Sequence, residues 1–151
     1  YNQDNETSWL DWGKLESNRD VFRFFQCMIA FRKAHPSIAR THFWREDVAW
    51  YGAQHNVDMS GESRTLAYCL HGESQADTDI YAMTNSSLEP VQFGIHEGAA
   101  GQWRRVIDTS LASPDDFADS NGKPVNSSSY VVAARSVVVL VRNRQLNTGG
   151  S

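Results

Sequence analysis

The sequence predicts a mainly β protein, an antiparallel β-sandwich preceded by one long α-helix and an N-terminal loop. After Pro36, short runs of β-branched and aromatic residues alternate with turn-forming segments. No helical pattern separates these runs, which favours antiparallel pairing over a βαβ fold. Before Pro36, a single apolar-rich segment carries clear helix start and stop signals. A chain of 151 residues, 40% of them hydrophobic, is long enough for one domain with a sizeable core.

The expected helix covers residues 17–36. Ser17 or Asn18 can cap its start, Asp20 lies in the first turn, and Pro36 ends it. Its apolar residues occupy more of the helical circumference than the single stripe of a surface helix, so we expect neighbours on more than one side. One sandwich is not expected to bury all of the large ones. The remaining apolar patch would either pack in a rearranged position or drive self-association. These residues are Phe22, Phe24, Phe25, Met28 and Phe31.

The expected strands follow one another from residue 42 to residue 142. They span residues 42–44, 48–51, 64–70, 79–85, 91–95, 102–107, 129–133 and 136–142. In the third strand, the larger side chains lie on one face and Ala67 and Cys69 lie on the other, which can still be buried because it is small. The apolar run 137–141 shows no alternation, which predicts a strand covered on both faces.

Charge and hydropathy exclude two classes of partner. The formal net charge is −4 and no basic cluster is present, which argues against nucleic acid and against an anionic membrane surface. The longest apolar run, residues 137–141, is far shorter than the roughly 20 residues needed to cross a bilayer. The chain does not begin with Met, and we expect it to be a fragment of a longer polypeptide.

The cysteines and histidines suggest neither a disulfide framework nor a metal site. Cys27 and Cys69 fall in an expected helix and an expected strand, which favours two thiols over a disulfide and a reducing, cytoplasmic location. The five histidines lack an HExxH spacing, and the loop 114–124 fails the calcium-loop template. No nucleophile elbow or phosphate-binding glycine loop is present. We therefore expect no metal and no cofactor.

The opening segment YNQDNETSWLDW places carboxylates beside aromatic side chains, which is typical of sugar-binding clefts. A retaining glycosidase needs two carboxyl groups about 5–5.5 Å apart, and Asp4 with Glu6 supplies the count. Neighbouring carboxylates are common in polar loops, however, and nothing in the sequence fixes the separation of this pair or moves their pKa values apart. We expect no catalytic residue in this segment.

Tryptophans offer a second hypothesis, a carbohydrate-binding module. Sugar rings stack on exposed indoles, and Trp44, Trp50 and Trp103 could form such a platform. The opposing interpretation is that these three side chains lie in strands and fill the core of the sandwich. A third hypothesis is a binding or adhesion sandwich that does not recognise sugars. Solvent exposure of the indoles and affinity for glucan distinguish the three.

The order of several motifs adds a family resemblance. The chain runs from YNQDNETSWLDW through a helix ending IAFRKAHPSI to DVAWYG, RTLAYCLHG, IYAMTNSS, QWRRVIDTS and SYVVAARSVVVL. In this order, over nearly the whole chain, the motifs resemble the C-terminal part of bacterial glycogen debranching enzymes of the isoamylase type. These enzymes are glycoside hydrolases of the α-amylase superfamily, and they hydrolyse α-1,6 branch linkages of glycogen and limit dextrin.

The resemblance implies an N-terminal β-sandwich, a central (β/α)₈ barrel and a C-terminal β-sandwich. Residues 1–40 would then be the end of the catalytic barrel, residues 41–145 the C-terminal sandwich, and residues 146–151 a disordered tail. The missing barrel would pack on the helix 18–35. The family's three catalytic carboxylates lie upstream of the matching region and have no counterpart here.

The resemblance also gives the N-terminal loop a role. Barrel enzymes bind substrate on loops at the C-terminal ends of their strands, so this loop would border the α-glucan cleft. The residues expected to contact the glucan there are Tyr1, Gln3, Asp4 and Asn5.

Overall fold

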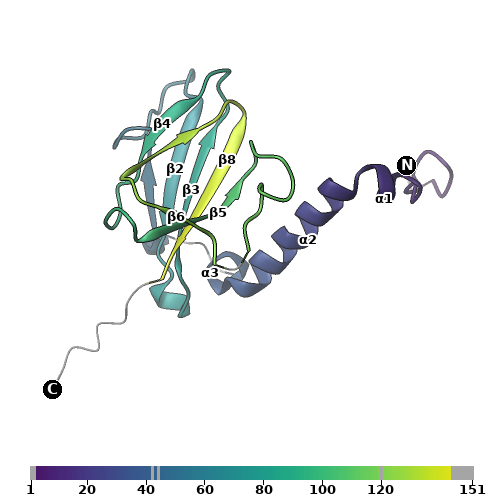
Figure 1. Cartoon of the computed structure of the whole chain (residues 1–151), viewed down its shortest axis with the longest axis horizontal. Helices are drawn as coiled ribbons and strands as arrows, with labels where there is room; N and C mark the ends of the chain where they lie inside the picture. The colour runs from purple at the N-terminus through teal and green to yellow at the C-terminus, as the bar shows by residue number, and fades with distance from the viewer. Residues whose placement is uncertain (1–2, 42, 44, 120, 144–151) are drawn as a thin grey trace.

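The computed structural model describes residues 3–41, 43, 45–119 and 121–143. Within these residues the chain forms three α-helices, two short 3-10 helices and eight strands (Figure 1). The elements are α1 (Lys14–Ser17), α2 (Arg19–Ala34), α3 (Pro36–Ala39), η1 (Arg45–Asp47), β1 (Val48–Tyr51), β2 (Thr65–Leu70), η2 (Glu73–Gln75), β3 (Asp79–Asn85), β4 (Val91–Gly94), β5 (Trp103–Asp108), β6 (Lys123–Val125), β7 (Ser129–Val132) and β8 (Ser136–Arg142).

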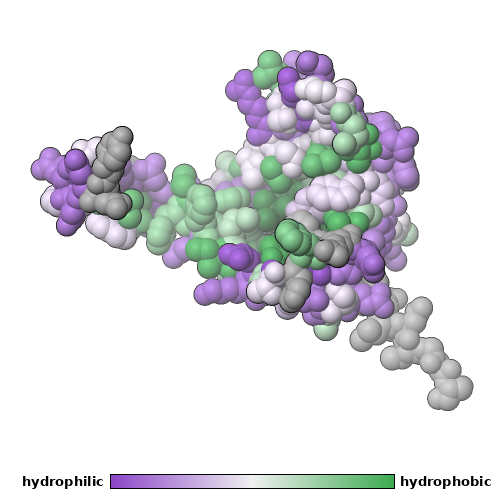
Figure 2. All heavy atoms as spheres, turned by 180° about the vertical axis from the view of Figure 1, so that it is seen from behind, coloured by the Kyte–Doolittle hydropathy of each residue, from purple (hydrophilic) through white to green (hydrophobic). Residues whose placement is uncertain are grey.

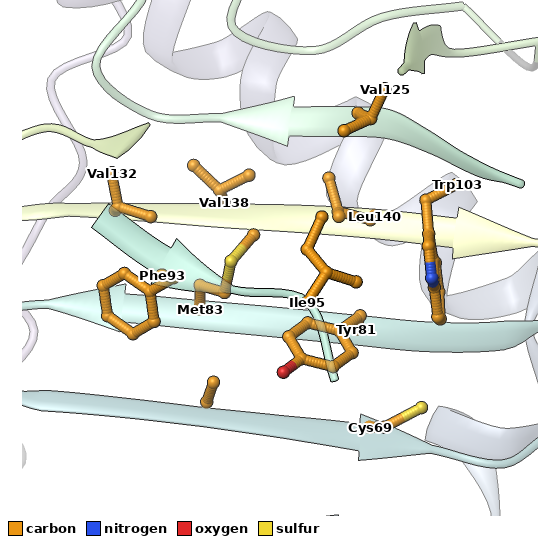
Figure 3. Close-up of a cluster of buried hydrophobic side chains, with 11 residues drawn as sticks. Cys69, Tyr81, Met83, Phe93, Ile95, Trp103, Val125, Val132, Val138 and Leu140 are labelled. Carbon is orange, nitrogen blue, oxygen red and sulfur yellow. The ribbon is translucent and has the colours of Figure 1, made fainter. Parts of the chain in front are cut away.

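The strands form two antiparallel sheets that face each other. The larger sheet has the order β1-β2-β3-β8-β5-β6, and the smaller one pairs β4 with β7. The buried core lies between them, with Tyr81 and Met83 from β3 facing Phe93 from β4 and Val132 from β7 (Figure 3). The predicted antiparallel β-sandwich preceded by a long helix is confirmed.

Seven of the eight expected strands are present. Three of them, β1, β3 and β8, have the expected bounds. β2, β4 and β7 differ by one residue at one end, and β5 is shifted by one residue at both ends. The expected strand at residues 42–44 falls largely outside the described residues, since only Phe43 is described there, and it is not in a strand. The sequence reading missed β6, which pairs with β5 on one side only. Pro124 is tolerated in β6 because an edge strand can lack one ladder N–H.

β2 and β8 show which face of a strand is buried in the core. In β2 the small residues Ala67 and Cys69 are fully buried, whereas Leu66 is 38% exposed. The small face therefore points into the core, against the bulky side chain of Tyr81, which pairs with Cys69 in the register. In β8, Val138 and Leu140 are fully buried but Val137, Val139 and Val141 are only half-buried. The prediction that β8 is covered on both faces is thus met on one face and only partly on the other.

The expected helix corresponds to α2, which the one-turn helices α1 and α3 flank. Asn18 is the N-cap residue of α2, but its side chain donates to Lys14 O and Ser17 Oγ instead of capping α2, because the turn of α1 comes immediately before it. The helix ends with the His35 N–H bonded to Phe31 O, and Pro36 then begins α3 at the position that needs no donor. The expected side-chain cap is therefore absent, while the expected stop at Pro36 becomes a change of direction.

A buried ion pair connects the central strand to the last strand. Asp79 is fully buried and accepts hydrogen bonds from Arg142 Nη2 at 2.6 Å and from the Gly72 N–H at 3.0 Å. The Arg142 guanidinium also lies 4.7 Å from the ring centroid of Trp103. Both charges therefore lie against the core, and each is stabilised by the other.

We expect Asp79→Ala to lower the free energy of unfolding by about 3–5 kcal/mol, because Arg142 is left as a buried charge without its carboxylate. Urea denaturation followed by circular dichroism measures this loss. Glu62→Ala is the matched control: Glu62 pairs with Arg64 at 3.7 Å with both side chains largely exposed, and its loss should cost less than about 1 kcal/mol. Equal, small losses for the two variants would contradict the prediction.

Candidate functional site

The N-terminal loop presents three of the four expected glucan contacts. Tyr1 lies outside the described residues; Gln3 and Asp4 are exposed and Asn5 is half-buried. Asn5 Nδ2 donates to Gln3 Oε1 at 2.9 Å, and Asn5 Oδ1 accepts from the Thr7 N–H at 3.0 Å. The loop thus uses the side chain of Asn5 to brace itself, while Gln3 and Asp4 remain at the surface.

Asp4 interacts with a tryptophan and not with a second carboxylate. Its Oδ1 accepts a hydrogen bond from Trp9 Nε1, and Trp9 and Trp12 are 60% and 72% exposed. The loop and α1 lie at the end of α2 that is remote from the sandwich (Figure 1). This arrangement offers exposed indoles next to a carboxylate, which suits contact with a sugar.

The three candidate stacking tryptophans differ in how far the structure exposes them to solvent. Trp103 is 1% exposed, fills the core between the sheets, and donates from Nε1 to the Glu97 carbonyl at 2.6 Å (Figure 3). The prediction of a sugar-stacking role for Trp103 is therefore wrong, because its β5 position faces the smaller sheet. Trp44 lies outside the described residues.

Trp50 is the candidate that reaches the surface. It is 50% exposed on β1, an edge strand, and its ring centroid lies 5.4 Å from that of Tyr68, its register partner on β2, at an interplanar angle of 53°. Leu66, two residues before Tyr68 and on the same face, is also partly exposed. Together Trp50, Tyr68 and Leu66 form an aromatic and apolar surface on the outer side of the larger sheet, which we call the outer-sheet patch.

Helix α2 has one contacting face and one open face. No α2 residue is fully buried. The open face carries large apolar side chains at helical spacing and appears as a continuous hydrophobic surface beside the sandwich (Figure 2). Its members are Val21, Phe22, Phe25 and Ile29, each between 45% and 63% exposed. The expectation that one sandwich cannot bury all the phenylalanines of this helix is confirmed.

The contacting face packs on the loop after β5. Phe24 and Phe31 pack edge-to-face against Phe117, with centroid distances of 5.9 and 6.1 Å. Arg23 donates to Ser113 Oγ at 3.0 Å and pairs with Asp116. Between α2 and the larger sheet a cavity of about 1030 Å³ remains, lined in part by Cys27, Phe31, Val106 and Val141. The helix is thus fastened mainly by aromatic and charged side chains, with open space beside them.

A carboxylate fixes the corner between α2 and α3. The Asp77 side chain is 4% exposed; its Oδ1 contacts His35 Nδ1 at 2.9 Å, and its Oδ2 accepts from the Ser37 N–H at 3.0 Å. Burial alone would raise the pKa of Asp77, but the hydrogen bonds from His35, Ser37 and Thr78 favour the carboxylate and hold the pKa below its usual value. This carboxylate ties both helices to the β2–β3 connection.

Three residues that could ligate a metal converge at the end of β2. Cys69 Sγ, His71 Nε2 and a carboxylate oxygen of Glu97 lie within 4.8 Å of one another. Tyr51 donates from its hydroxyl to Glu97 Oε1 at 2.9 Å; burial and this hydrogen bond raise the pKa of Tyr51 to about 12, so it stays protonated at neutral pH. The sequence predicts no metal site, since its histidines show no HExxH spacing. No short motif marks the trio, because Glu97 follows His71 by 26 residues.

The fold matches two solved structures. It superimposes on the pullulanase type I of Bacillus subtilis in complex with maltose, with a TM-score of 0.67 and 19% identity over 89% of this chain and 17% of that one. An α-amylase from H. orenii matches with a TM-score of 0.51 and 18% identity, over 87% of this chain and 22% of that one. Both solved chains therefore contain a domain with the fold of this chain.

The sequence identifies the family. The family model "Isoamylase 1-3, C-terminal" matches residues 49–145, and the chain belongs to this family. "Isoamylase 3, chloroplastic" of Oryza sativa subsp. japonica is 33% identical over 143 residues, covering 93% of this chain and 18% of the relative. The "Glycogen operon protein GlgX homolog" of Mycobacterium tuberculosis is 27% identical, over 93% of this chain and 22% of the relative. The chain spans about a fifth of the length of these curated relatives.

The isoamylase of Pseudomonas amyloderamosa, a bacterial relative, is 31% identical over 117 residues, which cover 72% of this chain and 15% of the relative. The resemblance to isoamylase-type debranching enzymes is confirmed by these matches. Among the described residues, no helix is long and apolar enough to cross a membrane.

The corner at Asp77 gives a pH prediction. The pKa of Asp77 in the folded protein lies below the ordinary value of 3.8, so its contribution to stability is complete above that value and is lost as the pH falls through the folded-state pKa. We expect Asp77→Asn to be less stable than the unmodified protein at pH 7 and to lose less stability on acidification to about pH 3. Urea denaturation at both pH values measures this, and parallel losses in the two proteins would contradict it.

Proposed function

We propose that this chain is the C-terminal part of an α-1,6-glucan debranching enzyme and is itself structural and non-catalytic. The observation that carries the proposal is the open apolar face of α2, which the sandwich does not cover. A missing catalytic barrel would pack on residues 18–35, in agreement with the membership in the isoamylase C-terminal family. On this proposal residues 1–40 end the barrel and residues 41–145 form the C-terminal domain. The tail expected at residues 146–151 lies outside the described residues.

The substrate of the complete enzyme is proposed to be glycogen or its limit dextrin. Relatives named as isoamylase and as glycogen operon protein support this choice. The N-terminal loop would then lie at the rim of the glucan cleft, with Tyr1, Gln3, Asp4 and Asn5 in contact with sugar. The exposed side chains of Gln3 and Asp4 and the exposed indole of Trp9 suit this role.

A cytoplasmic location is also proposed. Cys27 and Cys69 are both present as thiols, and Cys69 is fully buried in the core. Thiols persist in a reducing compartment, which supports this location. Fractionation of the source cells, with the enzyme traced by antibody, distinguishes the cytoplasm from an organelle such as the one named for the chloroplastic relatives.

The proposal is tested by comparing the full-length protein with this chain. Assayed on glycogen limit dextrin, the full-length protein is expected to release linear maltooligosaccharides, and the chain alone to release none. Release by the chain alone would overturn its non-catalytic role. Failure of the full-length protein on every α-1,6-branched glucan would overturn the debranching assignment.

The open face of α2 predicts a further outcome of the same proposal. Without the barrel, this face is expected to drive self-association of the isolated chain, which sedimentation velocity measures as a concentration-dependent increase in mass. Replacing Phe22, Phe25 and Ile29 with serine should restore a monomer. Leu88→Ser removes another exposed apolar side chain, 69% exposed and on the loop before β4, and should leave the association unchanged.

The outer-sheet patch supports a second candidate function, a glucan-stacking surface. Trp50 is half exposed and lies beside Tyr68, so a sugar ring could lie on the pair without any movement of the sheet. On this proposal the domain holds a glucan chain while the barrel acts on it.

Titration with maltooligosaccharides or glycogen, followed by tryptophan fluorescence, tests the second candidate. We expect saturable quenching that weakens at least about tenfold, or about 1.4 kcal/mol, in Trp50→Ala. Trp9→Ala is the control for an exposed tryptophan outside the patch. A flat response at millimolar sugar, or an equal loss in the two variants, would contradict stacking on Trp50.

A further inference from the structure

Cys69, His71 and Glu97 bring three different metal-ligand types to one point of the sandwich. Their ligand atoms lie within 4.8 Å of one another, with Cys69 fully buried and the side chains of His71 and Glu97 27% and 21% exposed. From this geometry we propose that the trio binds a divalent transition metal and that zinc is the ion it fits best. The proposal is independent of the glucan-binding function.

The fold fixes each ligand separately. Cys69 and His71 are two residues apart at the end of β2, so their side chains leave the same face of the strand. The His71 N–H donates to Asp47 O at 2.7 Å, which holds the strand end against η1. The Glu97 carbonyl accepts from Trp103 Nε1 at 2.6 Å. The site is therefore built on backbone that the core already holds.

Glycine after Glu97 completes the turn that presents the carboxylate. Gly98 has φ +70°, which side chains rarely adopt, and a Cβ there would lie 2.0 Å from Arg142 Nη1. Arg142 in turn is held by Asp79 and stacks on Trp103. The backbone around Glu97 is thus held by Trp103 and Arg142, two residues that belong to the larger sheet.

The donor set fits zinc in geometry and in charge. A tetrahedral zinc ion with bonds of about 2.0–2.3 Å holds its ligand atoms about 3.3–3.8 Å apart. The present separations, 3.0 Å between His71 Nε2 and Glu97 Oε1 and all within 4.8 Å, reach these values by small side-chain rotations. One thiolate, one carboxylate and one neutral imidazole balance the charge of Zn²⁺, which lowers the cost of placing the ion at a half-buried position. Solvent reaches the site past His71 and Glu97 and supplies a water as the fourth ligand.

Binding requires proton release and no redox step. The Cys69 thiol loses its proton to solvent, and the sulfur, His71 Nε2 and Glu97 each donate an electron pair to the metal. The metal replaces the hydrogen bond between His71 Nε2 and Glu97 Oε1, and the neutral imidazole carries its single proton on Nδ1. Tyr51 keeps its hydrogen bond to Glu97 Oε1 at 2.9 Å and orients the carboxylate, as outer-shell donors do in metal sites.

The bound metal would join the two sheets. Cys69 and His71 belong to β2 and its end in the larger sheet, whereas Glu97 follows β4 of the smaller sheet. A metal held by both is a cross-link across one end of the sandwich, and it stabilises the folded state because the unfolded chain does not hold the three ligands together.

The test uses Co²⁺ as a spectroscopic probe and Zn²⁺ as the competitor. Titration of the metal-free 151-residue chain with Co²⁺ should produce a thiolate-to-cobalt charge-transfer absorption with one equivalent bound, and Zn²⁺ should abolish it. Cys69→Ser should remove this absorption, and His71→Ala should weaken binding at least about 100-fold, more than outer-shell changes usually do. Tyr51→Phe, which removes only the donor to Glu97, should weaken binding about 10–100-fold.

Two control variants separate this site from other thiols and imidazoles. Cys27→Ser removes the other cysteine. His55→Ala removes an exposed histidine whose ring centroid lies 5.6 Å from that of Tyr51. Both should keep the absorption and the affinity. Loss of the absorption in Cys27→Ser, or no absorption at all in the unmodified chain, would overturn the proposal.

A thermal measurement keeps the test decisive if Cys69→Ser does not fold. Zn²⁺ should raise the unfolding temperature of the unmodified chain and of His55→Ala, and it should leave that of His71→Ala unchanged. An equal rise in His71→Ala would show that zinc binds elsewhere and would overturn the assignment.

Discussion

The arrangement of this protein depends on the packing of α2, which carries more apolar surface than the sandwich can cover. Phe24 and Phe31 pack on Phe117, and Arg23 pairs with Asp116. At the end of the helix, Asp77 binds His35. These polar contacts fix the direction of the helix. They leave Phe22 and Phe25 toward solvent, so the side of the helix away from the sheet is the one with unsatisfied hydrophobic surface.

The two kinds of contact explain how α2 can pack on the sandwich with one face and on a second domain with the other. Charged and aromatic contacts are directional and hold α2 in one orientation on the sandwich, whereas apolar burial is non-directional and supplies most of the free energy of association. Charged and aromatic contacts hold one face of α2 on the sandwich, and the opposite face is left open for apolar burial. The helix is therefore preorganised for a partner. The cost of ordering it is then met within this domain and not at the moment of docking.

Sequence alone could predict the sandwich and the helix, because alternation marks strands and end signals mark the helix. It could not predict which tryptophan is buried and which is exposed. Trp50 and Trp103 both lie in strands, but the face that a short strand turns to the core is decided by its neighbours in the sheet, and β1 is an edge strand with one neighbour. The same limit hid β6, where Pro124 weakens the strand signal. It also hid the trio of Cys69, His71 and Glu97, which is assembled by tertiary contact alone.

The connection from β2 to β3 joins the cluster of Cys69, His71 and Glu97 to the corner between α2 and α3. It begins at His71, which faces Glu97, and ends at Asp77, which holds the corner of α2 and α3. Between them Gly72 approaches the carbonyl oxygens of Asp77 and Thr78 so closely that a Cβ would lie 2.3 Å from each, and its N–H donates to the buried Asp79. The two ends of this short segment are also tied to each other, because the Asp77 N–H donates to the Gly72 carbonyl at 3.0 Å. Because interiors this tightly packed deform little, a change that orders His71 also restricts the segment that sets the direction of the helix.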